Sequence, residues 1–258
     1  MKIDLHVHSH FSKRSSIWLL NKIGCNESYT DPRQLYAIAM ERGMDAVTIT
    51  DHNAIGGCLE ILDLPNTFIS CEVTTYFPED RCKVHVLVYD ISELQFEEID
   101  EIRENIYSLV EYLNDHDIYY ALAHPFYSPN DKLSTEHIEK CMLMFKHFEL
   151  NGDEDTFVNE AVEQLVQHST QEKIEALSLK HGLRAYGVRP WEKCLIGGSD
   201  DHSGLNIARA YTDAPEAKDL NSFWEQYKEC RTEGVFVAEP APKSMAHNIY
   251  GVAYQFYN

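Results

Sequence analysis

The chain lacks any apolar run near the ~20 residues that a membrane-spanning helix needs. Its first ten residues, MKIDLHVHSH, are too polar for a secretory signal peptide. We therefore expect a cytoplasmic protein with no membrane partner. The seven cysteines contain no C-x-x-C pair and no recognised nucleophile signature. This odd, dispersed set predicts reduced and mostly buried thiols rather than a disulfide framework.

Basic residues are also scarce, with 22 Lys and Arg against 42 Asp and Glu and a net charge of −20. Such a surface repels the phosphate backbone over most of its area, so we expect no nucleic-acid partner. A small phosphorylated substrate is not excluded, because bound divalent cations can reverse the potential inside one cleft. The charge says nothing about oligomeric state.

The hydrophobic pattern alternates short apolar runs with longer stretches of helical period. Asp31-Pro32 is typical of a helix start and Gly43 of its end, and Gly182 ends a long pattern that begins near Asp155. A second helical pattern runs from Phe96 to Leu113. The candidate strands are Lys2–Leu5, Ala46–Ile49, Thr67–Cys71, Val84–Val88, Tyr119–Ala123, His147–Leu150 and Leu195–Gly197.

Strands that alternate with helices through short connections predict parallel pairing, and seven of them predict a closed or nearly closed barrel. The length of 258 residues suits such a barrel, which commonly needs about 250. No repeat or linker is visible, so we expect one α/β domain over 1–258. Its last part, 244–258, is predicted to be an amphipathic helical tail that covers the barrel or continues into a further segment.

Residues of metal-ligand type recur where these strands end. Residues two apart in a strand point the same way, so the H-x-H and D-x-H pairs can each grip one ion. Active sites of such barrels lie at the carboxyl ends of the strands. A core without metal would need a separate buried partner for each of these groups, so their convergence predicts a metal centre. The eight candidate ligands are His6, His8, His52, Glu72, His85, His124, Asp200 and His202.

The ligand types restrict the metal and suggest the chemistry. Imidazole and carboxylate without thiolate suit zinc, iron or manganese, and the sequence does not rank them. Glu72 is the natural bridging ligand, because a carboxylate can give one oxygen to each of two ions. A water held between two ions would serve as a hydroxide nucleophile near neutral pH.

At this point the motifs DLHVH, TITDHN, ISCEVTT with KVHVLV, LAHPF and GGSDDHSG resemble, in order, the signatures of the PHP (polymerase and histidinol phosphatase) superfamily. The resemblance covers about Met1 to Ser203. It implies a distorted seven-stranded (β/α)7 TIM-like barrel with two to three divalent metal ions at its carboxyl-terminal face. The runs SYTDPRQLY and EVTTYFPED more narrowly resemble PHP modules that precede a glycosyltransferase in longer chains.

The resemblance also implies how the ligands divide. One ion would be held by His6, His8, Glu72 and Asp200, and a second by Glu72, His85 and His124. The third would use His52, His202 and an acidic residue from the loop after the first strand. On this basis we take Glu72, Asp200 and His202 as the candidate catalytic residues.

The chain departs from the family pattern in that loop. Many members read Ser-Asp-Gly where this chain has Ser12-Lys13-Arg14. A protonated lysine cannot replace a carboxylate ligand. Three outcomes follow: His10 ligates instead, the third site is weak, or Lys13 fills the space with its own charge.

Other residues near the motifs are candidates for contact with substrate or ligands. Lys13, Arg14 and Arg189, with Arg184, are candidates for gripping substrate phosphate, since arginine and lysine suit its oxygens. Glu149, after the sixth strand, is expected to orient neighbouring groups rather than bind metal.

Three functions compete at this stage. The first is a phosphoesterase that hydrolyses a small phosphorylated substrate with a metal-bridging hydroxide. The second is a metal-dependent amidohydrolase, against which the Asp200-x-His202 pair and Glu72 stand. The third is a non-catalytic or regulatory metal-binding module of a larger, glycosyltransferase-type protein, an idea to which Lys13 gives weight.

Overall fold

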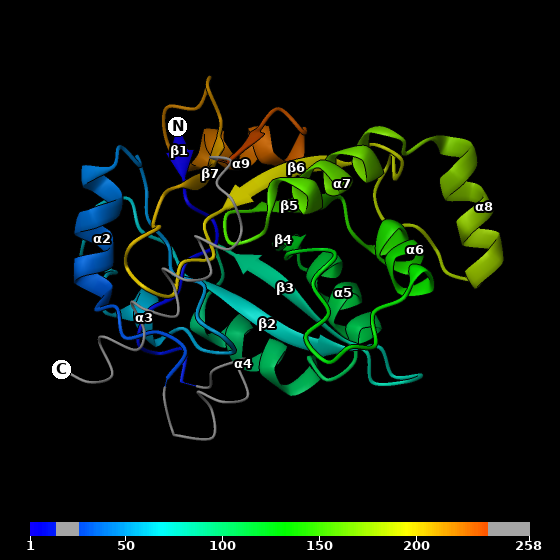
Figure 1. Ribbon diagram of the computed structural model, residues 1–258, viewed down its shortest axis with the longest axis horizontal. Coiled ribbons are helices and arrows are strands. Elements are labelled where there is room, and N and C mark those ends of the chain that lie inside the picture. The colour runs from blue at the N-terminus through cyan, green and yellow to red at the C-terminus, as the bar shows by residue number, and fades with distance from the viewer. Residues whose placement is uncertain (14–25, 237–258) are drawn as a thin grey trace.

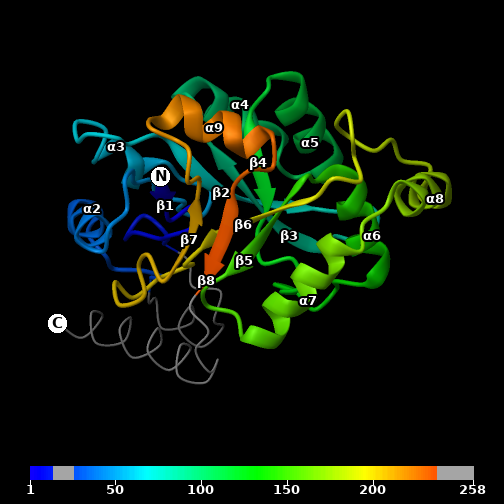
Figure 2. The same cartoon turned by 90° about the horizontal axis from the view of Figure 1, so that it is seen from above.

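The computed structural model describes residues 1–13 and 26–236 (Figure 1). Its strands are β1 (Lys2–Ile3), β2 (Ser70–Tyr76), β3 (Lys83–Tyr89), β4 (Tyr119–Leu122), β5 (His147–Asn151), β6 (Cys194–Gly198), β7 (Ala210–Asp213) and β8 (Glu233–Phe236). Its helices are α2 (Pro32–Glu41), α3 (Gly56–Leu59), α4 (Glu93–Ile102), α5 (Ile106–Asp115), α6 (Thr135–Met144), α7 (Thr156–Gln167), α8 (Gln171–His181) and α9 (Leu220–Lys228). Figure 2 shows the strands at the centre with helices arranged around them.

The strands form two sheets, and only part of the pairing is parallel. The five-stranded sheet has the order β2-β3-β4-β5-β6, and the three-stranded sheet has the order β1-β7-β8. β4, β5 and β6 are parallel, whereas β2, β3 and β4 are antiparallel, so the prediction of parallel strands was wrong there. The connection from Phe77 to Cys82 is closed by a 2.9 Å bond between Phe77 N and Cys82 O. Such a short turn can join only antiparallel strands.

The predicted closed barrel of seven strands is not formed by the described residues. The expected strand at Ala46–Ile49 makes only an isolated bridge from Val47 to Thr67. Beside it, Thr50 N donates to Val7 O over 2.9 Å, and side chains add further bonds, since Val7 N donates to Thr50 Oγ1 over 2.9 Å and Ser9 N to Asp51 Oδ1 over 2.7 Å. These polar side chains hold the first segment of the chain against residues 46–51 without a continuous sheet.

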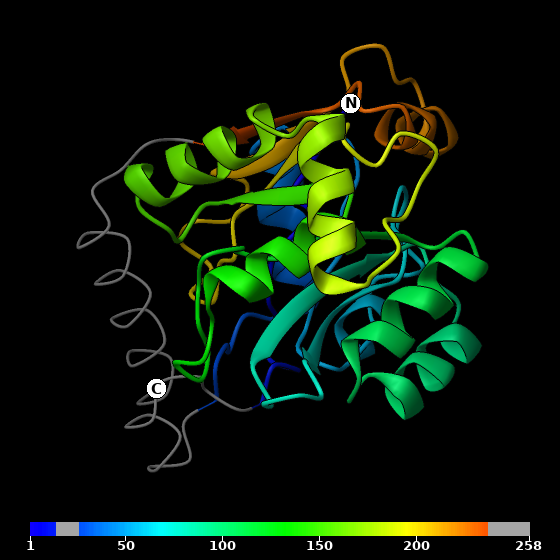
Figure 3. The same ribbon diagram turned by 90° about the vertical axis from the view of Figure 1, so that its right-hand side faces the viewer.

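The helices begin and end largely where their capping residues predict. Asp31 accepts a hydrogen bond from Gln34 N at the start of α2, and Gly43 follows its end with a φ of +88°. The two longer patterns each divide into two helices, because Asn105 caps α5 and Thr170 caps α8. α5 packs against β2, with α4 beside it (Figure 3).

Two clusters of buried apolar side chains form the core, and no described helix is long and apolar enough to cross a membrane. Of the cysteines, Cys194 and Cys230 form a disulfide, which corrects the expectation that all the thiols are reduced. Cys58, Cys71, Cys82 and Cys141 are free and buried, as predicted. The expected tail at 244–258 lies outside the described residues.

Candidate metal centre

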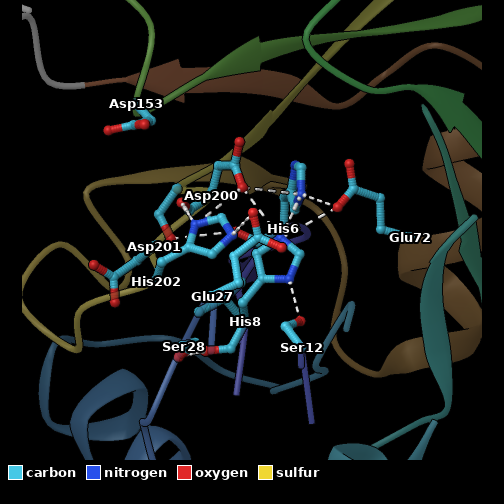
Figure 4. A network of polar contacts seen from close by, with 12 residues as sticks. His6, His8, Ser12, Glu27, Ser28, Glu72, Asp153, Asp200, Asp201 and His202 are labelled. Atoms are coloured by element: carbon cyan, nitrogen blue, oxygen red, sulfur yellow. Dashed lines mark hydrogen bonds and ion pairs between the residues drawn. The ribbon is translucent and has the colours of Figure 1, made fainter. Parts of the chain in front are cut away.

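Six imidazoles and two carboxylates that the sequence singled out converge in one place. Segments after β1, β4 and β6 and residues of β2 and β3 supply them, with His52 from the loop that bridges to Glu72. His6, His8 and His202 point toward one another, with Asp200 and Glu72 beside them (Figure 4). All eight predicted ligands are therefore brought together by the fold.

The first group of donors is centred on Asp200 Oδ1. It lies 3.2 Å from His6 Nε2 and 3.1 Å from His8 Nε2, and the two nitrogens are 3.0 Å apart. Glu72 Oε2 lies 3.3 Å from both nitrogens. Donors about 2.1 Å from one ion lie roughly 3.0–3.4 Å from each other, so this group fits a single cation.

The second group uses the other oxygen of the same carboxylate. Glu72 Oε1 lies 2.8 Å from His85 Nδ1 and 3.0 Å from His124 Nε2. β2 and β3 are antiparallel, with Thr74 opposite His85, which places His85 diagonally across from Glu72 on one face. Glu72 thus faces imidazoles on both sides, as a bridging ligand would.

The third group contains a residue that the sequence analysis missed. Glu27 Oε2 lies 3.1 Å from His52 Nε2, and Glu27 Oε1 lies 3.9 Å from His202 Nε2. Glu27 therefore places a carboxylate beside His52 and His202 that none of the three outcomes considered from the sequence included. A signal existed, because Glu27 is the only acidic residue between Asp4 and Asp31.

Two polar neighbours fix the orientation of the first histidine pair. Glu149 Oε1 lies 2.8 Å from His6 Nδ1, and Glu149 Oε2 accepts the backbone N–H of His124 over 2.7 Å. Ser12 Oγ lies 2.9 Å from His8 Nδ1. Both contacts leave the Nε2 atoms of His6 and His8 facing the cluster, as carboxylate and hydroxyl partners of metal ligands commonly do. The predicted orienting role of Glu149 agrees with these contacts.

The backbone at the site is held in conformations that ordinary residues seldom adopt. His124 has a φ of +26° and Asp200 a φ of +51°. Such conformations persist where the surroundings enforce them, often at functional sites. Gly198 permits a close approach beside Asp200, since a Cβ there would overlap His6 Cβ and lie 2.7 Å from Glu149 Oε1.

Burial and charge pull the pKa values of these groups in opposite directions. Burial alone would raise the pKa of Glu72, but the imidazoles of His52, His85 and His6 hold it well below its usual range. The pKa of Asp200 is likewise held well below its usual range by His6 and His8, against the effect of burial. Burial alone would lower the pKa of His6, but the carboxylates around it raise it well above normal. Burial lowers the pKa of His85 to about 4, which leaves that imidazole neutral.

The donors fit divalent cations. Several buried atoms that face the cluster make no hydrogen bond, although charged partners lie 2.8–3.9 Å away: His52 Nδ1, His85 Nδ1, His202 Nε2 and Glu72 Oε2. Unsatisfied buried groups are costly, and cations between them would remove that cost. Three of the four geometrically compatible groups of described residues fall here, and none of these contains cysteine. This donor set suits zinc, iron or manganese.

The predicted substrate contacts are not gathered in the same way. Lys13 is exposed and adjoins Ser12, so it lies beside the centre. Arg189 pairs with Glu192 over 2.7 Å before the amino end of β6, whereas Asp200 follows its carboxyl end, so Arg189 is not brought to the centre. Arg14 lies outside the described residues. The ring of His10 stacks on Phe11, and none of the compatible groups includes it.

Comparison with known proteins supports the fold. No family model matches the chain. A segment of 68 residues, 26% of this chain, is 37% identical to an uncharacterized protein of Methanocaldococcus jannaschii, and spans 38% of that protein.

Solved structures match over most of the chain. PsfC from Pseudomonas syringae PB-5123 matches 98% of both chains with a TM-score of 0.55 at 15% identity. The lesion-specific endonuclease PfuEndoQ from Pyrococcus furiosus matches 90% of this chain and 57% of its own, with a TM-score of 0.52 at 16% identity. These likenesses show a shared fold, in line with the PHP-like architecture that the motifs imply. The narrower resemblance to modules that precede a glycosyltransferase stays a prediction.

One expectation about partners is corrected by this comparison. An Endonuclease Q structure that contains a 27-mer duplex with an abasic lesion matches 92% of this chain, with a TM-score of 0.54 at 15% identity. That protein, which has this fold, therefore acts on DNA. The expectation that a nucleic-acid partner is excluded was wrong. The net charge describes the whole surface, whereas a substrate meets only the part around the site.

Proposed function

We propose that this chain is a metal-dependent hydrolase and that it cleaves phosphate esters. The observation that carries the proposal is the position of Glu72, whose two oxygens face separate sets of imidazoles within 2.8–3.3 Å. A core that served only stability would not need a buried carboxylate inside a ring of histidines. Two adjacent cation sites that share one carboxylate are the arrangement used for in-line displacement at phosphorus.

The residues divide the work. His6, His8, Glu72 and Asp200 would hold one ion, Glu72, His85 and His124 a second, and Glu27, His52 and His202 a third. When bound, such ions acidify a water molecule and neutralise charge on phosphoryl oxygens. Glu149 and Ser12 keep the ligating nitrogens of His6 and His8 turned inward. His202 Nδ1 lies 2.9 Å from Asp200 O, which leaves Nε2 directed at the centre, where it can bind an ion or hold a proton near the substrate.

Phosphate esters fit this centre better than amides do. An imidazole carries no charge when it binds a cation, and the cluster has more imidazoles than carboxylates, so bound cations would leave a net positive centre that favours an oxyanion. The exposed Lys13 next to Ser12 adds a further positive charge at the rim. Within this class, a small phosphorylated substrate is our first candidate, and the DNA-cleaving proteins of the same fold make a nucleic-acid phosphodiester the second.

The test is a metal-reconstituted sample assayed on phosphomonoesters, phosphodiesters, duplex DNA with an abasic site and amide substrates, with Glu72→Gln as the variant. Gln keeps the size of the side chain but removes its charge, so phosphoesterase activity should fall by about 100-fold or more. Glu79→Gln is the matched control, because Glu79 pairs with Lys140 at the surface. Equal activity of parent and Glu72→Gln would exclude the bridging role.

The panel also separates the competing functions. Turnover of amides alone would favour the amidohydrolase. Metal binding without turnover of any substrate would favour a regulatory module.

A further inference from the structure

A second cluster of metal-binding side chains lies at the opposite end of the central strands. His147 begins β5 and Cys194 begins β6, and the two residues are direct partners in the parallel register. Cys230 follows α9, and its Sγ is joined to Cys194 Sγ. The ligand atoms of these three residues lie within 4.8 Å of one another. Of the metal centre described above, Glu149 lies two residues further along β5 and Asp200 lies beyond the carboxyl end of β6, so this cluster is separate from that centre.

We propose that the reduced form of this cluster binds a zinc-like cation through Cys194, Cys230 and His147, and that oxidation to the disulfide closes the site. The Cα atoms of the two cysteines are 5.4 Å apart. This distance suits a disulfide. It also suits two thiolates on a tetrahedral ion, whose sulfur atoms lie about 3.8 Å apart when each bond is about 2.3 Å.

The imidazole is already arranged as a ligand. His147 is buried, and its Nε2 lies 2.8 Å from Tyr227 O, so Nε2 carries the proton and donates it to that carbonyl. The ring is held in place by stacking on Tyr227 at 3.7 Å between centroids. Nδ1 is then the nitrogen with a lone pair. A backbone carbonyl that fixes the tautomer in this way is the usual second partner of a ligating histidine.

The surroundings favour thiolates and leave room for a further ligand. Lys146, the residue just before His147, acts electrostatically on that imidazole. Nearby cations favour the thiolate over the thiol. Cys230 is half-buried, so water or an added ligand can complete a four-coordinate ion. Two thiolates and one imidazole form a donor set that prefers zinc over magnesium or calcium.

A dithiol can serve as the reductant that opens the disulfide. Two electrons and two protons pass from the dithiol to the Cys194–Cys230 disulfide, which gives two thiols here and a disulfide in the reductant. Binding of the cation then releases both thiol protons to solvent.

The test uses the full chain, reduced with dithiol, freed of metal with a chelator and titrated with Co²⁺ alone. Thiolate-to-cobalt charge-transfer absorption reports this cluster specifically, because no compatible group around Glu72 contains a cysteine among the described residues. We expect this absorption in the reduced parent, its loss in Cys230→Ser and Cys194→Ala, and its retention in Cys141→Ala, which removes a buried free thiol elsewhere. Oxidation of the parent should abolish it.

Two readouts keep a folding defect apart from a lost ligand. The circular dichroism spectrum of Cys230→Ser should match that of the parent. Co²⁺ binding at the centre around Glu72, which gives no thiolate charge-transfer absorption, should also be unchanged in this variant. No charge-transfer absorption in the fully reduced parent would overturn the proposal and leave a structural disulfide only. Absorption that survives in both cysteine variants would overturn it as well.

Discussion

Glu27 Oε2 lies 3.1 Å from His52 Nε2, with the carboxylate buried beside the metal centre. This pair changes the significance of Lys13, because the third group of ligands has an acid that does not come from the Ser12-Lys13-Arg14 segment. Burial alone would lower the pKa of His52, but Glu72 and Glu27 raise it well above its ordinary range. The same two carboxylates, Glu72 and Glu27, would balance the charge of a bound cation.

Replacing Glu27 by Gln should therefore remove the third ion and leave the other two. Gln keeps one oxygen but loses the charge that a cation at His52 and His202 would need. Metal content per chain, measured after reconstitution and desalting, should fall by one ion relative to the parent. Lys13→Ala is the control and should keep the parent stoichiometry, since that side chain is exposed. If Lys13→Asp gains an ion while Glu27→Gln loses none, the acid of the third site is not Glu27.

Glu149→Gln should weaken metal binding without removing a ligand. The variant loses the charge that holds His6 Nδ1–H, so the imidazole becomes a poorer and less well oriented donor. Affinity for the first ion should fall by about 10–100-fold, as measured by competition with a chromophoric chelator. Glu79→Gln again serves as the control, with unchanged affinity. An unaltered affinity in Glu149→Gln would mean that the charge of Glu149 is not what positions His6.

The sequence predicted which side chains gather in one place better than it predicted the strands that carry them. His6 and His8, two apart along an extended segment, share a cation-sized space because side-chain alternation is a local property. Sheet closure is not local. Val7 and Ser9 are held largely by the side chains of Thr50 and Asp51 rather than by a continuous ladder, and a hydrophobic pattern does not predict such contacts.

Glu27 was missed for a related reason. It precedes α2, far along the chain from His52, and only the folding of that segment back onto His8 brings it to the site. Ser28 Oγ, which donates to His8 O over 3.2 Å, marks the contact. The antiparallel pairing of β2 and β3 was also not predicted. Phe77-Pro78 indicates a turn, but it does not show that the strands on either side pair with each other.

The last prediction concerns pH and Lys193, a half-buried lysine whose Nζ donates to Phe145 O over 2.7 Å. Burial, with a smaller effect from Lys146, lowers the pKa of Lys193 to about 7. The unfolded chain keeps this proton up to about pH 10.4. Between these values the unfolded state binds more protons than the folded state, so the free energy of unfolding should rise with pH from about 7 to about 10 through this group.

Lys193→Met keeps the length of the side chain and removes the titration. Urea unfolding of parent and variant at several pH values across that window isolates the effect, because the other titrating groups are common to both proteins. The free energy of unfolding of the parent should rise relative to that of Lys193→Met as pH increases. Lys173→Met, at an exposed lysine of α8, should run parallel to the parent. The outcome against the prediction is a difference in free energy of unfolding between parent and Lys193→Met that stays constant across the window. It would show that Lys193 keeps its proton in the folded protein up to about pH 10.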